Sequence, residues 1–245
     1  MRSDGSVGMV GSDCRRRLRT SCSSRRRLAL LSVLMLPSAR LQAQCSRGAW
    51  AAEAFTGSAW HLPMPLVVDL PEEHARLRAH YDTRPFADAP YYSYRLGHTW
   101  TSGRAVELEM LHHKLYLDNP RPPVERFEVT HGYNLPTVNA VWPASGWQLR
   151  LGLGLVVAHP EGRIAGRAVS GGRTLLGGGY HIAGVTAQVA LGRRYVLWGR
   201  RVAMTAAPEI KLTASWARIP LQHGHVSVPD VSLHALGGLG VRLCE

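Results

Sequence analysis

Histidine and glutamate residues near the middle of the chain are the ones best placed to do chemistry. His112 and His113 are adjacent, and Glu128 and His131 follow after a short link. If the two segments form a hairpin through residues 118–123, positions whose numbers sum to about 241 lie opposite each other. His113 then faces Glu128 as a histidine–carboxylate pair, and His112 and His131 become diagonal neighbours on the other face. These four residues are the candidate catalytic group, and the alternative is a purely interfacial role for the outer histidines.

Other histidine, glycine and cysteine patterns predict neither a metal site nor a cofactor. His223-Gly224-His225 has no carboxylate nearby in sequence, and no His-Glu-x-x-His motif occurs. The glycine-rich stretch 170–179 lacks the Gly-Lys-Ser/Thr of a phosphate loop and is expected to be an external loop. Cys45 and Cys244 would stand at the two ends of the mature chain. In an oxidising compartment they either pair as a disulfide or remain two free thiols.

Most of the positive charge lies in an N-terminal leader. The 245 residues carry 29 Lys+Arg against 17 Asp+Glu, a net charge of +12, but residues 1–44 hold nine arginines and only two acidic residues. An apolar stretch at 28–36, followed by small residues, completes the pattern of a signal peptide exported by the Sec route and cleaved between Ala39 and Cys45. Ser24-Arg25-Arg26 leaves a twin-arginine signal as the alternative. The remaining charge is dispersed, which argues against a nucleic-acid partner.

Beyond about residue 75, polar and apolar residues alternate, which predicts β-strands. We expect eight strands, at 74–84, 89–100, 103–117, 124–142, 147–157, 178–197, 201–217 and 229–243. Short links alternate with longer ones, as in an all-β, antiparallel up-and-down transmembrane barrel. The expected organisation is a signal peptide at 1–44, an extended lead-in at 45–73 and the barrel at 74–245.

The two faces of these strands predict a polar lumen inside an apolar wall. The inward face collects charges of both signs, which would form paired networks that plug the narrow lumen of eight strands. Its members are Arg76, Arg78, Arg95, Glu107, Glu109, Glu128, Arg150, Gln188, Glu209, Lys211, His234 and Arg242. Aromatic residues lie near both ends of the strands, as expected at two membrane interfaces. They are Trp100, Trp142, Trp147 and Trp198 at the short links, and Tyr91, Tyr92, Tyr116, Tyr180 and Trp216 at the long ones.

The segments 127–134, 209–213 and 228–240 resemble the small eight-stranded outer-membrane barrels of the OmpA and opacity type, which include lipid A oxidase-like and other lipid A-modifying members. Such barrels usually end in an aromatic residue, whereas this sequence ends in Cys244-Glu245. Lipid A deacylase-type barrels carry a His-x-Ser arrangement on the outer wall. Here the corresponding run is His131-Gly132-Tyr133, without a serine.

These patterns leave three candidate functions. The first is a structural or surface-interaction protein of the outer membrane of a Gram-negative-type envelope, with a filled lumen. The second is an enzyme that modifies lipid A, and the third is a soluble secreted barrel that binds an apolar ligand. The expected partners are outer-membrane lipids, lipopolysaccharide and the barrel-assembly machinery, and the protein is expected to be a monomer without a cofactor.

Overall fold

The computed structural model describes residues 45–87, 90–171 and 179–245, which belong to one compact unit, 39–245. The predicted signal peptide lies outside the described residues. Among the described residues, regular structure consists of β-strands. No helix in this part of the chain is long and apolar enough to cross a membrane.

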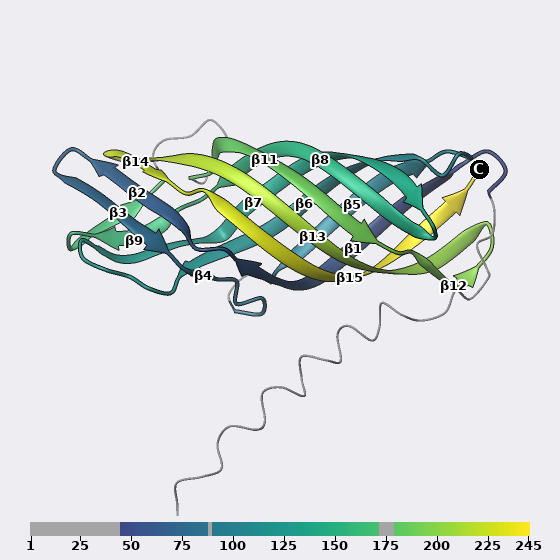
Figure 1. Cartoon of the computed structure of the whole chain (residues 1–245), viewed down its shortest axis with the longest axis horizontal. Coiled ribbons are helices and arrows are strands. Elements are labelled where there is room, and N and C mark those ends of the chain that lie inside the picture. The colour runs from purple at the N-terminus through teal and green to yellow at the C-terminus, as the bar shows by residue number, and fades with distance from the viewer. Residues whose placement is uncertain (1–44, 88–89, 172–178) are drawn as a thin grey trace, which may run out of the picture. The chain divides into compact units, whose positions relative to one another are not determined.

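Eight long strands pair into a closed antiparallel ring (Figure 1). In ring order they are β1 (Ala49–His61), β5 (Tyr92–Thr99), β6 (Ala105–Leu117), β7 (Val124–Ala144), β8 (Trp147–Ala158), β11 (His181–Gly192), β13 (Val202–Leu221) and β15 (Asp230–Cys244). Each strand pairs with the next along the chain, and β15 pairs with β1 over the whole length of β1. The predicted fold class, an all-β antiparallel barrel of eight strands, is confirmed.

The first strand of the wall is not the one expected. Residues 46–73, expected to be an extended lead-in, contain β1 and the shorter strand β2 (Met64–Leu70). The alternation in β1 is hard to see in the sequence because alanine occupies both faces: Ala51 points inward and Ala52 outward. The segment 74–84 instead forms β3 (Glu73–Ala79), which pairs with β2, and β4 (Tyr81–Asp82). Consequently Arg76 and Arg78, expected in the lumen, are exposed on β3.

Short strands extend the wall at the end with the long links. β9 (Glu161–Ile164) and β10 (Arg167–Ser170) continue the sheet from β7, and β14 (Gly224–Ser227) joins β13 to β2 and β3. We call this part the extension, and it occupies the left end of Figure 1. Its interior is apolar. The fully buried side chains there include Leu66, Val68, Leu115, Phe127, Ile164, Ile219 and Val226.

The opposite end has tight links and both ends of the described chain. Residues 100–104 and 145–146 are short turns, and β12 (Tyr195–Gly199) folds back onto β13. Cys45 and Cys244 form a disulfide there, with their Cα atoms 5.1 Å apart. The Glu245 amide also donates to the Gly48 carbonyl, so β1 and β15 are joined at their outer limits.

Candidate functional site

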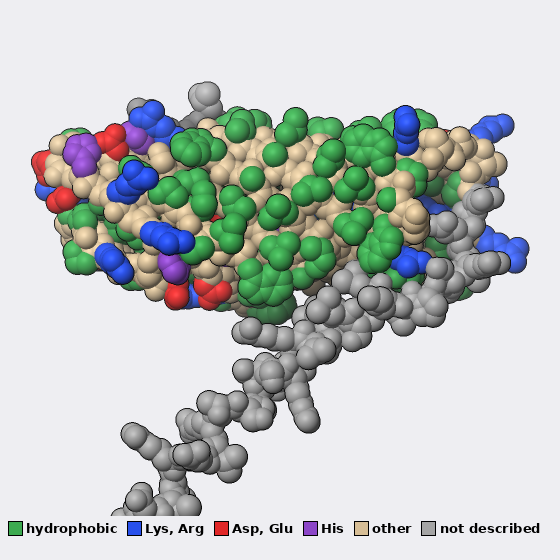
Figure 2. Space-filling view, viewed as in Figure 1, with side chains coloured by type: hydrophobic (Ala, Val, Ile, Leu, Met, Phe, Trp, Pro, Cys, Tyr) green, Lys and Arg blue, Asp and Glu red, His purple; other side chains and the backbone are tan. Residues whose placement is uncertain are grey.

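An apolar belt surrounds the middle of the barrel. Outward side chains on the ring strands are leucine, valine, isoleucine and methionine, and Leu153 is 72% exposed. Figure 2 shows these side chains over the middle of the molecule, with charged and histidine side chains concentrated over the extension at the left. A belt of this kind in contact with water would be strongly unfavourable, whereas acyl chains suit it.

Exposed aromatic side chains border the belt at both ends. Near the tight turns they are Trp50, Trp100, Trp142 and Trp198, and near the long links they are Trp60, Tyr94 and Trp216, with the half-buried Tyr92 beside Tyr94. We call these the lower and upper aromatic rings. Two of the residues expected in the upper ring, Tyr91 and Tyr116, are buried instead. The closed wall, the apolar belt and the two aromatic rings together indicate that the barrel spans a membrane. The chain is a transmembrane barrel of the outer-membrane type.

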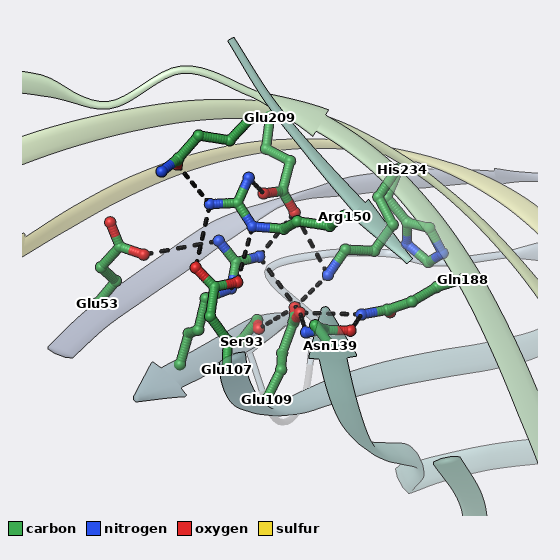
Figure 3. Close-up of polar contacts among 12 residues, drawn as sticks. Glu53, Ser93, Glu107, Glu109, Asn139, Arg150, Gln188, Glu209 and His234 are labelled. Atoms are coloured by element: carbon green, nitrogen blue, oxygen red, sulfur yellow. Dashed lines mark hydrogen bonds and ion pairs between the residues drawn. The ribbon is translucent and has the colours of Figure 1, made fainter. Parts of the chain in front are cut away.

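Inside the belt, buried charges form an ion network (Figure 3). The guanidinium of Arg95 is central: its Nη2 donates to Glu209 at 2.8 Å and to Glu109 at 3.2 Å. Arg150 donates through Nε to Glu107 at 2.8 Å. These residues come from strands on different sides of the ring, so the network ties together walls that do not adjoin.

With its remaining members, the network contains equal numbers of positive and negative side chains. Lys211 donates to Glu109, and Arg194, which was not predicted from the sequence, donates to Glu53 at 2.7 and 2.9 Å. Four carboxylates thus meet four cations. The carboxylates are those of Glu53, Glu107, Glu109 and Glu209, and the cations are Arg95, Arg150, Arg194 and Lys211.

Neutral side chains add hydrogen bonds at one carboxylate of the network. Ser93, Asn139 and Gln188 all donate to the Glu109 carboxylate. A cavity of about 680 Å³ lies beside the network at the tight-turn end, with Arg194 and Arg242 in its lining. Arg242, expected as a member of the network, is half-buried at this mouth. Among the described residues, the middle of the lumen is therefore filled by the network, and its lower mouth is hollow.

A second polar cluster lies between the ion network and the apolar interior of the extension. The Asp230 carboxylate is fully buried, with Oδ1 2.7 Å from His61 Nδ1 and Oδ2 3.2 Å from His113 Nε2. The rings of His61 and His113 stack at 4.9 Å. Burial raises the pKa of Tyr81, which lies on β4 beyond the upper ring, and the negative charge of Asp230 raises it further. The end of the lumen beneath the extension therefore holds one buried carboxylate in contact with two imidazoles. We call this group the histidine–aspartate cluster.

Hydroxyl groups continue the cluster toward the ion network. Ser232 donates to Asp230 Oδ2 at 2.8 Å, and its Oγ lies 3.1 Å from His234 Nε2. His234 Nδ1 lies 2.6 Å from the hydroxyl of Tyr91. The arrangement differs from a nucleophilic triad, in which the two histidine nitrogens contact the acid and the nucleophile separately. Here His113 approaches both Asp230 and Ser232 through the same Nε2.

The expected pairing of His113 with Glu128 is wrong. His113 lies opposite Tyr133, and Glu128 lies opposite Tyr116; the register also shifts between His113 and Leu115. Gly132 takes a φ of 122° in the same region of β7, a conformation that favours glycine. Glu128 instead accepts from Arg126 at the surface. The bulge accounts for two of the five positions between Glu128 and Tyr133, and the other three arise because the hairpin is centred later in the chain than expected.

The other two predicted residues lie on the outer wall near the upper ring. The His112 ring stacks on Tyr92 at 4.7 Å, and its Nδ1 lies 2.8 Å from Asn134 Oδ1. His131 is exposed, and its Nδ1 lies 3.1 Å from Glu161 Oε1. His159 Nε2 is 3.5 Å from the same oxygen. We call His131, His159 and Glu161 the surface cluster.

Several site residues were missed from the sequence. His61 and Glu53 lie in the segment taken as a lead-in, and Arg194 lies beside a tight link. Asp230 was placed at the start of a predicted strand, but no pattern connected it with histidines more than 100 residues away. The alternation in β1, Glu53 inward between Ala52 and Ala54 outward, is the signal that could have found Glu53.

Comparison with known proteins gives a likeness in fold alone. No family model matches the sequence, and no curated protein matches it. The solved structures with a similar fold include the outer membrane protein OprG from Pseudomonas aeruginosa, with 14% identity, coverage of 82% of this chain and 99% of that chain, and a TM-score of 0.42. Outer membrane protein AlkL in lipid bilayers has 13% identity, 84% and 94% coverage and a TM-score of 0.44. Neisserial surface protein A has 12% identity, 81% and 99% coverage and a TM-score of 0.34.

Proposed function

We propose that this chain is a non-conducting outer-membrane protein with a structural or surface-interaction role. The observation that carries the proposal is the ion network, which fills the lumen with charges of both signs in equal number. An ion crossing the barrel would have to displace side chains whose pairing is complete. Removing one partner of a buried pair costs about 3–5 kcal/mol, so spontaneous opening would be rare.

The extension supports the second part of the proposal. It rises beyond the upper ring, and its outer face carries arginines that can reach anionic groups of the surrounding surface. The exposed arginines there are Arg76, Arg78, Arg121, Arg126, Arg163, Arg167 and Arg218. Three of them pair with acidic neighbours, Arg126 with Glu128, Arg163 with Glu125 and Arg167 with Glu72. The positive charge of the others suits the phosphates of lipopolysaccharide, which is the proposed lipid partner.

Conductance through a planar lipid bilayer tests the proposal. The purified protein should insert, shift in gel mobility when heated, and produce no steady current. A variant in which the network is cut, Arg95→Ala, should produce intermittent current if the network is the plug. A steady current through the unaltered protein would contradict the proposal, and so would a protein that stays soluble without detergent.

A second candidate function, modification of lipid A, is favoured by the surface cluster. His131 and Glu161 form a histidine–carboxylate pair on the outer wall, where the acyl chains and head groups of outer-leaflet lipid would meet it. The Thr130 hydroxyl lies 3.5 Å from His131 Nδ1, at the limit of a hydrogen bond. Mass spectrometry of lipid A from cells with and without the protein separates the two functions. Unchanged lipid A would exclude the enzyme function. A change in lipid A that is lost in His131→Ala would assign the site.

A further inference from the structure

The histidine–aspartate cluster carries a charge that the ion network does not neutralise. In that network four carboxylates meet four cations, so no cation of the network is left for Asp230. The ion-pair partners of Asp230 among the described residues are two imidazoles, His61 and His113. A buried carboxylate is costly unless a positive charge matches it, and here that charge can be a proton on one of the imidazoles or a bound metal ion.

The donor atoms of the cluster converge as metal ligands do. The nitrogens of His61 and His113 and a carboxylate oxygen of Asp230 all lie within 4.8 Å of one another. Two donors bound to one tetrahedral zinc ion are about 3.4 Å apart. His113 Nε2 lies 3.2 Å from Asp230 Oδ2, whereas His61 Nδ1 and Asp230 Oδ1, 2.7 Å apart, would separate by about 0.7 Å to share the ion. Two imidazoles and one carboxylate form a set that divalent transition metals accept, whereas calcium and magnesium prefer oxygen alone.

Groups behind two of the three donors, His61 and Asp230, hold them in place, whereas the far nitrogen of His113, Nδ1, is buried without a hydrogen-bond partner among the described residues. The far nitrogen of His61, Nε2, lies 2.9 Å from Thr83 Oγ1, and the Thr83 hydroxyl donates to the Ala59 carbonyl at 3.3 Å. With Nδ1 facing the ion, Nε2 would carry the proton and donate it to Thr83, which is the usual outer contact of a ligating histidine. Ser232 donates to the Asp230 carboxylate in the same way.

We propose that His61, His113 and Asp230 bind one divalent transition-metal ion of the zinc type inside the barrel. The ion would neutralise Asp230 and join three strands, β1, β6 and β15, immediately beneath the extension. Ser232 Oγ, which is 3.4 Å from His113 Nε2, stands within reach as a fourth donor. The site is fully enclosed, so the ion would enter while the barrel folds and would serve stability. This inference does not depend on the proposed function, because a plugged barrel needs no metal.

The surface cluster is the competing location. His131, His159 and Glu161 also bring three donor atoms within 4.8 Å, but they are partly or fully exposed, and such groups commonly remain without an ion. The two locations share no residue, so single substitutions separate them.

Metal analysis of the mature barrel, extracted in detergent without chelator, tests the proposal. We expect about one zinc ion per chain, and its loss in Asp230→Asn and in His113→Gln. Thr83→Val, which removes only the outer contact of His61, should weaken the affinity about 10- to 100-fold. His112→Gln is the matched control, since His112 is the neighbour of His113 but lies on the outer wall, and it should keep the ion.

Folding and coordination are checked separately. Each variant is included only if its gel mobility still shifts on heating. X-ray absorption of the zinc-loaded unaltered protein should show two imidazole ligands, a result that requires no substitution. The proposal is overturned if the folded unaltered protein binds no ion, if Asp230→Asn keeps it, if His131→Ala removes it, or if the absorption spectrum shows oxygen ligands alone.

Discussion

The membrane-spanning part of the barrel and the extension are built from the same strands with opposite chemistry. On β13, Glu209 and Lys211 point into the lumen while Ile210 and Leu212 face outward. Farther along the same strand, Ile219 and Leu221 point inward and Arg218 faces outward. The alternation does not slip between these two stretches, so neither the geometry nor the register of β13 changes. What changes is the surroundings: lipid outside the lower part and water outside the upper part.

This contrast shows how one strand satisfies two solvents. In lipid the wall must be apolar, so polar side chains collect inside and have to pair with one another. In water the exterior can be charged, and the interior gains from burying apolar area in the ordinary way. The histidine–aspartate cluster lies between the polar lumen and the apolar interior of the extension. Asp230 lies opposite Ser215 on β13, and the next inward residue, Ala217, begins the apolar inward stretch of that strand.

The largest effect we predict comes from unbalancing the ion network. Glu109→Leu leaves Lys211 with Glu209 alone, 3.4 Å away, and removes part of the hydrogen bonding of Arg95. The network then has four cations and three carboxylates, which should lower the free energy of unfolding by about 3–5 kcal/mol. Denaturant unfolding in lipid vesicles, followed by tryptophan fluorescence, measures it. Glu109→Gln, which keeps a hydrogen-bonding side chain of the same size, should cost less. A loss of under about 1 kcal/mol for the leucine variant would mean that the lumen charges are hydrated rather than paired.

The second prediction compares the same added charge at two places, the apolar belt and the outer face of the extension. Leu153→Arg puts a cation in the middle of the apolar belt, where it should cost about 2–4 kcal/mol. Ala168→Arg makes a comparable change on β10, an exposed strand of the extension, and surface changes of this kind stay within about 0.5 kcal/mol. The same unfolding experiment in vesicles compares them. Equal costs for the two variants would show that the belt does not contact lipid.

Much of the fold could be predicted from the sequence because alternation is strong where the two faces differ most. Leu149, Leu151 and Leu153 alternate with Arg150 and two glycines, and β8 was found nearly to its ends. β1 was not found, because small residues on both faces weaken the contrast. The partner of His113 could not be predicted, because it depends on a bulge and on Asp230, which is 117 residues away in sequence. Long-range contacts of this kind are set by closure of the ring.

A third prediction concerns the apolar interior of the extension. Ile219→Val removes one methylene from a fully buried side chain and should cost about 0.5–1.5 kcal/mol. We expect the loss to be local, because the ion network below is held by its own pairs. Limited proteolysis should cut the extension faster while the gel mobility of the heated and unheated barrel stays unchanged. A uniform decrease in the stability of the whole barrel would instead show that the two parts unfold as one unit.

The smallest effect is predicted for an ion pair on the outside of the extension. Glu72 lies 2.8 Å from Arg167, as close as many pairs of the lumen, but both side chains are at least 70% exposed. Water already solvates both charges there, and salt screens their attraction, so Glu72→Gln should change the free energy of unfolding by about 0–1 kcal/mol and by less at high salt. Measured beside Glu109→Gln under the same conditions, it holds the substitution constant and varies the burial and the number of partners of the carboxylate. Similar costs at the two sites would contradict the view that burial, and not the distance between the charges, makes the ion network strong.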